Sequence, residues 1–421
     1  MSRFDWVQTS QREEALARPR GRGDAALRAS VMSIVDDVRD RGWDAVVDVA
    51  TRIDGAAPKS IEVAPFADEA RRILPAAAQE AMRLAARAIE TFHRQTLPRN
   101  TEVITYPGLS VSKLWRPLSR AGLYVPGGKA PLFSTLLMLA IPARVAGVRE
   151  LVVVTPPRAE GGLDPAIALA AEIAGIDAIW TIGGAQAVAA LAFGAGDIPA
   201  VDIICGPGNS WVSTAKSLVA SMAGGPGIDL PAGPSELMVI ADDSSDPVTV
   251  AADLLSQAEH DREAQVIVVS PSGGLLDAVA AEVDRQSAML TGDLAPTRYV
   301  LCFDLEEAVS IANLYAPEHL SLACDGAAAL VPAIRNAGAV FVGHQAAESF
   351  GDYLAGSSHV LPTDGAARFS GGVSTLTFMK AMTVQSVSKA AASSLAIPAA
   401  ALARLEGLEA HARAAEARAV A

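Results

Sequence analysis

The sequence predicts an α/β protein with two doubly wound domains, and three observations support this fold class. Three apolar runs in the middle of the chain, ELVVVTPP, DAIWTIGG and VDIICGPGN, each close in Gly or Pro and recur at intervals of about 25 residues. Ala-rich segments of helical character separate these runs, which gives the order β-α-β-α-β. A second series of the same kind runs from ELMVIAD through AQVIVVSPS and RYVLCFD to AVFVGH.

The strands of both series are apolar along their whole length. Such strands are buried on both faces, so we expect parallel sheets with helices on both sides. In open sheets of this type, ligands bind at the carboxyl ends of the strands. The Gly-rich and Pro-rich ends of the runs are therefore where we look for a site.

The segments outside the two series have different compositions. Residues 1–19 are polar and rich in Arg and Glu, which predicts an N-terminal arm. Residues 25–95 carry apolar side chains three and four apart, as helices do, and Pro98 ends this pattern. The last part of the chain, from KAMTVQSV onward, is predicted to form helices and an exposed tail.

Length and composition exclude several classes of protein. A chain of 421 residues is too long for one compact core, because domains typically hold ~100–200 residues. The net charge of -13, without a basic block, argues against nucleic acid and against anionic membranes as partners. Three cysteines far apart form neither a disulfide framework nor a zinc knuckle, so we expect a reducing, cytoplasmic location.

One uncharged segment, residues 178–196, resembles a membrane span by composition. Gly183 and Gly184 divide it into the β-rich run AIWTI and the Ala-rich stretch AQAVAALAFGAG. We therefore expect a strand, a turn and a buried helix here, and no transmembrane helix.

Histidine is scarce, with six residues, and five of these follow residue 255. The motif SQAEHD places Gln257 and His260 at i and i+3 near a helix end, where both can be presented to a metal. A zinc or manganese site with N and O donors would suit these residue types. The alternative is an exposed helix end among acidic residues. His93, on the helical stretch IETFHRQ, is predicted to be an ordinary surface or boundary histidine.

The motif YAPEHL places Glu318 and His319 directly after Pro317, which stops the preceding helix. In a loop both side chains can reach a cavity, where one acts as acid or base and the other activates water. A structural Glu-His pair at a helix end is the alternative.

Two further motifs carry candidate side chains. In ESFGDYLAGSSHVLP, Asp352 lies beside Gly351 and His359 follows seven residues later; the alternative for this carboxylate is an ordinary turn position. In EGLEAHARAAEAR, Glu406 and His411 are five residues apart on a terminal helix, which ordinarily forms a solvated face.

Gly-rich loops provide candidate positions for phosphate groups. The loops GLYVPGGKAP, TIGGAQA, CGPGNS and LPAGPSE follow strand ends, where backbone N–H groups and helix N-termini bind anions. None of them has the GxGxxG pattern, so a dinucleotide is compatible with the architecture without being required by the sequence. From the residues alone, we infer a two-domain α/β enzyme with a candidate metal site and a phosphate-bearing ligand.

Taken together and in order, these segments resemble the histidinol dehydrogenase family over nearly the whole chain. The strings that carry the resemblance are GLYVPGGKAPLFSTLLMLAIPARVAG, GGAQAVAALAFG, GPGNSWVSTAK, IDLPAGPSE, DLLSQAEH, APEHL, ESFGDYLAGSSHVLP and EGLEAH.

The resemblance implies roles for particular residues. It implies a zinc site formed by four ligands, the last from the partner subunit: Gln257, His260, Asp352 and His411. It implies that Glu318 and His319 are the catalytic acid/base pair. The substrate contacts that it implies are Ser235, His319, His359, Glu406 and the four zinc ligands, with Glu406 also supplied across the interface. The NAD contacts that it implies are Tyr124, Gln186 and Asn209.

The resemblance also implies a fold: a domain-swapped homodimer with two incomplete Rossmann-like domains, an N-terminal arm and a C-terminal helical tail. We expect the arm to span residues 1–19. A discontinuous first domain with the metal and substrate site would span residues 20–123 and 236–372. The NAD-binding domain would span 124–235, and the tail 373–421.

The implied reaction is the oxidation of L-histidinol to L-histidine through L-histidinaldehyde, with two NAD⁺ used in succession. His319 would remove the hydroxyl proton, and Glu318 would activate the water that hydrates the aldehyde. Two alternatives remain: a paralogous dehydrogenase of another polyol-like alcohol, such as a sulfonated propanediol, and a metal-dependent hydrolase.

Overall fold

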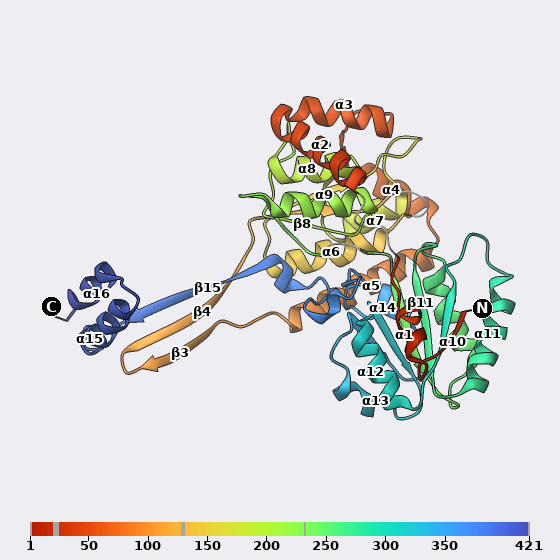
Figure 1. Ribbon diagram of the computed structural model, residues 1–421. Coiled ribbons are helices and arrows are strands. Elements are labelled where there is room, and N and C mark those ends of the chain that lie inside the picture. The colour runs from red at the N-terminus through yellow and green to blue at the C-terminus, as the bar shows by residue number, and fades with distance from the viewer. Residues whose placement is uncertain (1, 20–24, 128–130, 231–232, 420–421) are drawn as a thin grey trace. The chain divides into compact units, whose positions relative to one another are not determined.

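The computed structural model describes residues 2–19, 25–127, 131–230 and 233–419. Parts of three segments discussed above lie outside the described residues: 20–24 of the expected first domain, 128–130 of GLYVPGGKAP and 231–232 of LPAGPSE. The described residues form two compact units, 1–95 with 119–378 and 96–118 with 379–421 (Figure 1).

The first sheet of the larger unit has six strands, all paired in parallel, in the order β1-β12-β11-β10-β13-β14. Their bounds are β1 Ser2–Asp5, β10 Glu236–Ala241, β11 Gln265–Ser270, β12 Thr297–Leu301, β13 His319–Ala323 and β14 Ala339–Val342. The helices around this sheet are α1 Thr9–Ala15, α10 Pro247–Ala258, α11 Gly273–Ser287, α12 Leu305–Tyr315, α13 Ala327–Leu330 and α14 Glu348–Tyr353. The larger unit also contains the short helical turns η1 Val331–Ala333, η2 Ala366–Arg368 and η3 Thr375–Phe378.

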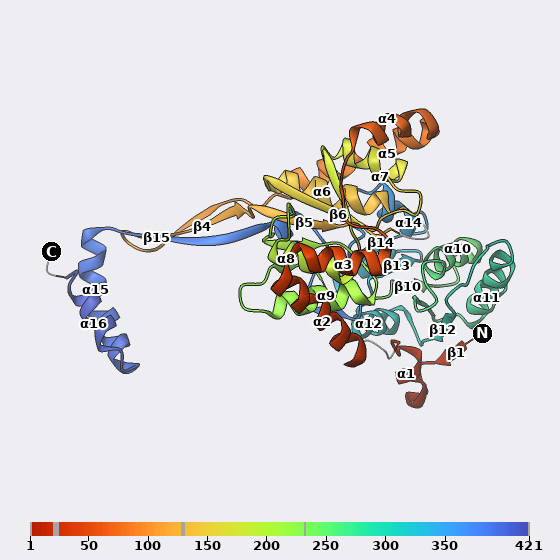
Figure 2. The same cartoon turned by 90° about the horizontal axis from the view of Figure 1, so that it is seen from above.

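Successive side chains of β10 point to opposite faces of the sheet, and both faces are covered by helices. Leu237 and Val239 pack with side chains from α10 and α11 in one core cluster. Met238 and Ile240 point the other way and pack with side chains from α1 and α12. Figure 2 shows α10 and α11 on one side of these strands and α12 on the other. The parallel sheet with helices on both faces confirms the fold class predicted from the apolar runs.

The second sheet of the larger unit has the order β2-β7-β6-β5-β8-β9 and is parallel except for the edge strand β2. Its strands are β2 Ser60–Glu62, β5 Arg120–Tyr124, β6 Glu150–Thr155, β7 Ala178–Thr181, β8 Ile203–Cys205 and β9 Gly227–Ile228. The accompanying helices are α2 Ala25–Arg41, α3 Trp43–Asp54, α4 Ala64–Ile73, α5 Ala76–Gln95, α6 Phe133–Ala146, α7 Pro165–Ile173, α8 Gly184–Phe193 and α9 Ser210–Ser221.

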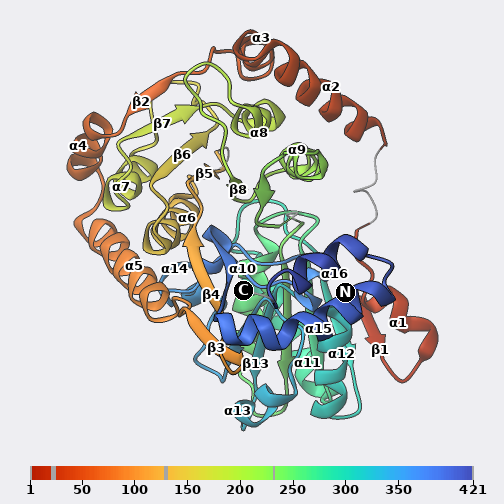
Figure 3. The same cartoon turned by 90° about the vertical axis from the view of Figure 1, so that its left-hand side faces the viewer.

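The two faces of this sheet are covered by different helices (Figure 3). Tyr124, Val152 and Val154 share a core cluster with side chains of α2, α3, α8 and α9. The helices α6 and α7 lie on the other side. Residues 25–54 thus belong to the core of this second sheet, which differs from the expected grouping of residues 20–123 with the first sheet. The reason is that the apolar stripe of α2 and α3 packs on α8 and α9, a choice that helical spacing alone does not encode.

The smaller unit joins two distant parts of the chain. Its antiparallel sheet has the order β15-β4-β3, with β3 Thr101–Tyr106, β4 Leu109–Pro117 and β15 Met379–Val387. The strand β15 leads into α15 Lys389–Leu405 and α16 Glu409–Glu416. The expectation of helices and an exposed tail from KAMTVQSV onward was therefore wrong for residues 379–387, which form a strand. This strand is exposed along most of its length, so it lacks the apolar signal by which the buried strands were recognised.

The uncharged segment 178–196 forms β7, a turn and the buried helix α8, as the two glycines predicted. In the described part of the chain, no helix combines the length and the apolar character needed to cross a membrane.

Candidate functional site

Glu318 and His319 lie where α12 gives way to β13, on the first sheet. Ala316 ends the helix with a φ of 57°, in the left-handed region, and Pro317 follows. His319 is the first residue of β13 and pairs in register with Leu237 of β10. The sequence motif therefore forms a helix-to-strand turn at the amino end of β13, and both side chains are buried.

The backbone of Glu236, at the start of β10, contacts both members of this pair. Its N–H donates to Oε2 of Glu318 at 2.8 Å, and its carbonyl oxygen lies 3.2 Å from Nδ1 of His319. Because a carbonyl oxygen only accepts, the neutral imidazole carries its proton on Nδ1 in this arrangement. Nε2 of His319 is then left as an acceptor.

Burial controls the ionisation of the pair. Burial lowers the pKa of His319 to about 3, opposed by the carbonyl of Glu236, so the ring is neutral at neutral pH. Burial raises the pKa of Glu318 well above its ordinary value. At neutral pH the His319 ring is therefore an acceptor of protons, whereas burial opposes ionisation of Glu318 and the Glu236 N–H favours it.

Two more carboxyl groups approach His319 from α14. Oε1 of Glu348 lies 3.2 Å from Nδ1 of His319, and Oδ1 of Asp352 lies 3.8 Å from Nε2. Burial raises the pKa of Asp352 to about 6 and that of Glu348 well above its ordinary value. The structure thus brings Asp352 to the acid/base pair. Glu348 was not identified from the sequence, although its spacing of four residues from Asp352 puts both on one helix face.

The residues predicted to bind zinc fit a metal site in part. Gln257 is buried in the last turn of α10, and neither its Oε1 nor its Nε2 has a hydrogen-bond partner among the described residues. A buried amide without hydrogen-bond partners is compatible with a ligand at this position, such as a cation. His260 follows in the turn after the helix and is exposed. Its electrostatic effect lowers the pKa of Asp352, against the larger effect of burial, which raises it. No cluster of three or more His, Cys, Asp or Glu with metal-binding geometry occurs in the described residues, consistent with a set that includes a glutamine.

His359 is held by both of its ring nitrogens. Nδ1 lies 3.2 Å from the carbonyl oxygen of Asp352, and Nε2 lies 3.1 Å from Oγ1 of Thr135 on α6. Burial lowers the pKa of His359 to about 4, so this ring is also neutral. His359 therefore connects the loop after α14 with a helix of the second sheet. Ser235, directly before β10, accepts from the N–H of Gln265 through its carbonyl.

The residues predicted to contact NAD lie at carboxyl ends of strands in the second sheet. The hydroxyl of Tyr124, at the end of β5, accepts from the N–H of Gly184 at 3.2 Å. Gln186 follows in the first turn of α8 and donates through Nε2 to Oδ2 of Asp54 at 3.1 Å. In the described residues its Oε1 has no partner. Asp54, the last residue of α3, was missed because nothing in its local sequence distinguishes it from a helix-end carboxylate.

Asn209 caps the N-terminus of α9, accepting from the N–H groups of Trp211 and Val212. The loop before it is anchored by a buried ion pair. Lys216 donates to Asp229 and, at 2.8 Å, to the carbonyl of Gly206. Tyr124, Gln186 and Asn209 thus lie close to the N-termini of α8 and α9, and helix N-termini favour the binding of phosphates.

Glu406 and His411 belong to the smaller unit. Glu406 directly follows α15, and His411 lies in α16; both are exposed within that unit. A side chain that is exposed on a small unit remains available to bind something else.

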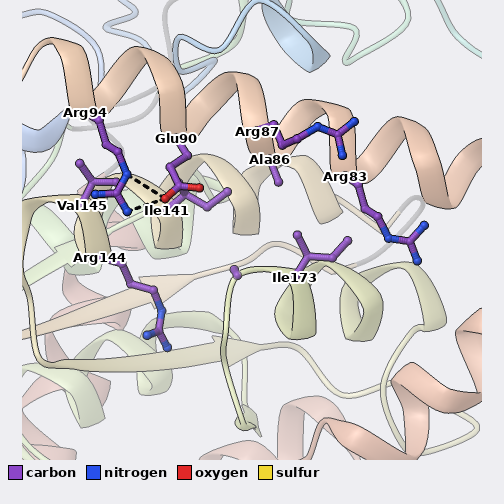
Figure 4. A pocket seen from close by; sticks show the side chains of 10 residues that line it. Arg83, Ala86, Arg87, Glu90, Arg94, Ile141, Arg144, Val145 and Ile173 are labelled. Atoms are coloured by element: carbon purple, nitrogen blue, oxygen red, sulfur yellow. Dashed lines mark hydrogen bonds and ion pairs between the residues drawn. The ribbon is translucent and has the colours of Figure 1, made fainter.

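Two pockets indent the larger unit. One, with a volume of about 330 Å³, opens beside His260 and is also lined by Glu259, Asp261, Arg262 and Leu294. The other, of about 430 Å³, lies between α5 and α6 and contains four arginines (Figure 4). Its guanidinium groups are already engaged: those of Arg83 and Arg87 with Glu80, that of Arg94 with Glu90, and that of Arg144 with the carbonyl of Gly175. None of the candidate site residues lines this second pocket.

Comparison with known proteins shows a similarity that covers nearly the whole chain. The family model described as histidinol dehydrogenase matches residues 17–419. A histidinol dehydrogenase of Xanthomonas campestris pv. campestris is 45% identical, with 98% of each chain covered. One of Legionella pneumophila is 42% identical over 98% of this chain and 97% of that protein. The crystal structure of histidinol dehydrogenase from Elizabethkingia anophelis matches with a TM-score of 0.94 and 36% identity, over 99% of this chain and 98% of that one.

Proposed function

The chain belongs to the histidinol dehydrogenase family, and from this premise we propose that it oxidises L-histidinol to L-histidine in histidine biosynthesis. We propose further that the reaction passes through L-histidinaldehyde, uses two NAD⁺ and depends on zinc. A cytoplasmic location is part of the same proposal. The observation that carries it is the buried Glu318–His319 pair, whose side chains are both contacted by the backbone of Glu236.

For the metal, Gln257, His260 and Asp352 would supply three ligands, and His411 of a second subunit would supply the fourth. Zinc, when bound, would hold the amine and imidazole nitrogens of the substrate and so orient the carbinol C–H bond. The orphaned amide of Gln257 supports this assignment.

For the cofactor, Tyr124, Gln186 and Asn209 would line the binding surface on the second sheet. NAD⁺, when bound, would accept the hydride from the carbinol carbon. The unpartnered Oε1 of Gln186 supports a ligand at this position, because buried polar atoms are normally hydrogen-bonded.

His319 would act as the base in both oxidations. Its Nδ1 is turned toward the carbonyl of Glu236, so Nε2 is free to take the hydroxyl proton as the hydride leaves. The low pKa of the ring keeps Nε2 unprotonated before each step.

Glu318 would act between the two oxidations. An aldehyde has no hydroxyl hydrogen to lose, so it must first add water to become a gem-diol that can lose a second hydride. Glu318, in its ionised form, would remove a proton from that water, and the Glu236 N–H that donates to its Oε2 favours that form against the effect of burial. His359 and Ser235 would contact the substrate, and enclosure of the site would retain the aldehyde.

The assembly that we propose is a domain-swapped homodimer. Each smaller unit would dock on the partner subunit, so that Glu406 and His411 complete the partner's site. The exposure of both side chains within their own unit supports this arrangement.

The test is to follow NADH formation with L-histidinol, simple polyols and a sulfonated propanediol as substrates. We expect NADH with histidinol only, at two NADH per histidine formed. NADH from the sulfonated diol but not from histidinol would favour the paralogous activity. Consumption of substrate without NAD⁺ would favour a hydrolase.

The zinc proposal has its own test. Chelation should abolish turnover, and added zinc should restore it, while a Gln257→Ala variant should bind less zinc than wild type by metal analysis. Normal turnover by exhaustively metal-free protein would contradict the metal assignment.

A further inference from the structure

Glu236 connects the acid/base pair to a distant part of the chain. Its backbone contacts Glu318 and His319, as described above. Its side chain is fully buried and points elsewhere, accepting from the N–H of Asp364 at 3.1 Å. Any shift of Glu236 along β10 would therefore move the hydrogen bonds of both members of the pair.

Arg18 of the N-terminal arm forms a bidentate ion pair with the carboxylate of Glu236. Nε and Nη2 of Arg18 donate to the two carboxylate oxygens at 2.6 and 2.9 Å. A planar guanidinium on a carboxylate forms two parallel bonds and fixes orientation as well as charge. The side chain of Glu236 is 1% exposed and that of Arg18 is 20% exposed, so solvent screens this pair only weakly.

The same guanidinium reaches the turn that precedes the pair. Nη2 of Arg18 donates to the carbonyl of Tyr315 at 2.9 Å and approaches that of Ala316 at 3.4 Å. Its carbon lies 3.9 Å from the centre of the Tyr315 ring, a cation–π contact. Ala316 has the left-handed φ of the turn and stands two residues before Glu318. Arg18 thus binds both Glu236, whose backbone orients the pair, and the turn at residues 315–316, which directly precedes the pair.

The arm itself is held in place independently of Arg18. Phe4 and Trp6 belong to the core cluster of the first sheet. Arg298 of β12 donates to the carbonyls of Ala15 and Ala17. The segment around Arg18 therefore has several anchors, and loss of one guanidinium does not by itself release the arm.

We propose that Arg18 is a positioning residue for the acid/base pair, acting through Glu236 and the turn at Ala316. This inference rests on the proposed function, because it takes Glu318 and His319 to be the catalytic pair. It assigns to the N-terminal arm a role in turnover in addition to its part in the sheet.

The first experiment compares Arg18→Met with Arg12→Met. Arg12 lies on the same arm, donates to the carbonyl of Trp6 and stacks on its ring, without contacting Glu236. We expect kcat of Arg18→Met to fall by roughly 10- to 100-fold with KM for histidinol and NAD⁺ within about 2-fold of wild type, since a misplaced catalytic group costs rate rather than binding. Arg12→Met should keep the wild-type kcat.

A second variant separates positioning from folding. Arg18→Met leaves a buried carboxylate without its counter-charge, which destabilises the protein. The double variant Arg18→Met/Glu236→Gln removes that charge, so its thermal midpoint should lie closer to wild type than that of the single variant. Its kcat should remain low, because the guanidinium bonds to the turn and to position 236 are still missing.

Recovery of the wild-type kcat in the double variant would overturn the inference, as would an equal loss of kcat in Arg12→Met. If Arg18→Met does not fold, the double variant carries the comparison alone. Absence of histidinol oxidation in the wild-type protein would contradict the proposed function instead, and it is detected before any variant is compared.

Discussion

At the scale of single residues, the candidate site is governed by burial of titratable groups. His319 and Glu318 are adjacent in sequence, and burial moves their pKa values in opposite directions. Each shift favours the neutral form of its group, since a low-dielectric surrounding penalises charge. The two neighbours are therefore poised for different proton transfers although they share one backbone partner, Glu236.

The first prediction separates their roles. Glu318→Gln should slow the oxidation of histidinaldehyde much more than that of histidinol, because only the aldehyde must add water. His319→Asn should slow both oxidations, because each hydride transfer releases a proton. The two half-reactions are measured separately by single-turnover formation of NADH, and an equal loss in both for Glu318→Gln would exclude the assigned division.

The second prediction concerns His93 on α5. This residue is 1% exposed, so the expectation of a surface or boundary position was wrong. Neither ring nitrogen has a hydrogen-bond partner in the described residues, and burial lowers its pKa to about 4. The native state then binds fewer protons than the unfolded state between pH 6.5 and about 4, so His93 makes stability fall as pH falls through this window.

Replacing His93 by Leu should reduce that fall in the free energy of unfolding by about 2 kcal/mol between pH 7 and pH 4.5. Urea unfolding at several pH values measures it. His344→Leu is the control, because His344 is partly exposed and lies 3.1 Å from Asp325. The expectation fails if the His93→Leu and wild-type proteins lose stability with the same slope.

At the scale of secondary-structure elements, the second sheet depends on a buried ion pair between α9 and the segment after β9. Lys216 and Asp229 each have a side chain that is 1% exposed. Lys216 also binds the carbonyl of Gly206, and Asp229 accepts from the Gly206 N–H at 2.7 Å. These hydrogen bonds to the C=O and N–H of Gly206 fix the segment that leads from β8 to Asn209, the capping residue of α9.

The third prediction is that Lys216→Met destabilises the protein by about 3–5 kcal/mol, since it leaves a buried carboxylate unpaired. The double variant with Asp229→Asn should recover part of that loss. Exposed Lys113→Met is the control and should change stability by less than about 0.5 kcal/mol. Denaturant unfolding measures all three, and a Lys216→Met protein as stable as the control would contradict the assigned role.

At the scale of the whole molecule, the question is which chain uses His411. The smaller unit combines residues 96–118 with 379–421 and has few buried side chains, so its exposed apolar residues need a surface to cover them. Ile397, Leu402 and Leu405 are 72%, 65% and 84% exposed. Docking on a partner subunit would bury them and would deliver His411.

The fourth prediction is intersubunit complementation. His260→Asn and His411→Asn chains should each be inactive alone. When they are refolded together, about half the dimers are hybrids and each hybrid has one intact site of two, so about a quarter of all sites should recover. Activity of the mixture is measured after hybrid formation has been verified with two affinity tags. No recovery would mean that His411 serves its own chain or no site.

The sequence by itself determined the strands that are buried on both faces and the helices between them. The run AIWTI with its two glycines predicted β7 and α8, because a fully apolar strand and an Ala-rich helix need no partner to be recognised. The motif YAPEHL likewise predicted a break in structure before Glu318, since Pro317 cannot continue a helix. These features are written in neighbouring residues.

Only the tertiary structure decided which distant segments meet. The exposed strand β15 pairs with β4 across more than half the chain, and its sequence gives no apolar signal for this. Three other contacts also join segments that are distant in sequence. Helices α2 and α3 pack on the second sheet, Glu348 lies beside His319, and Arg18 pairs with Glu236. Each depends on which surfaces pack together, and periodicity shows that a face is apolar or charged without showing what covers it.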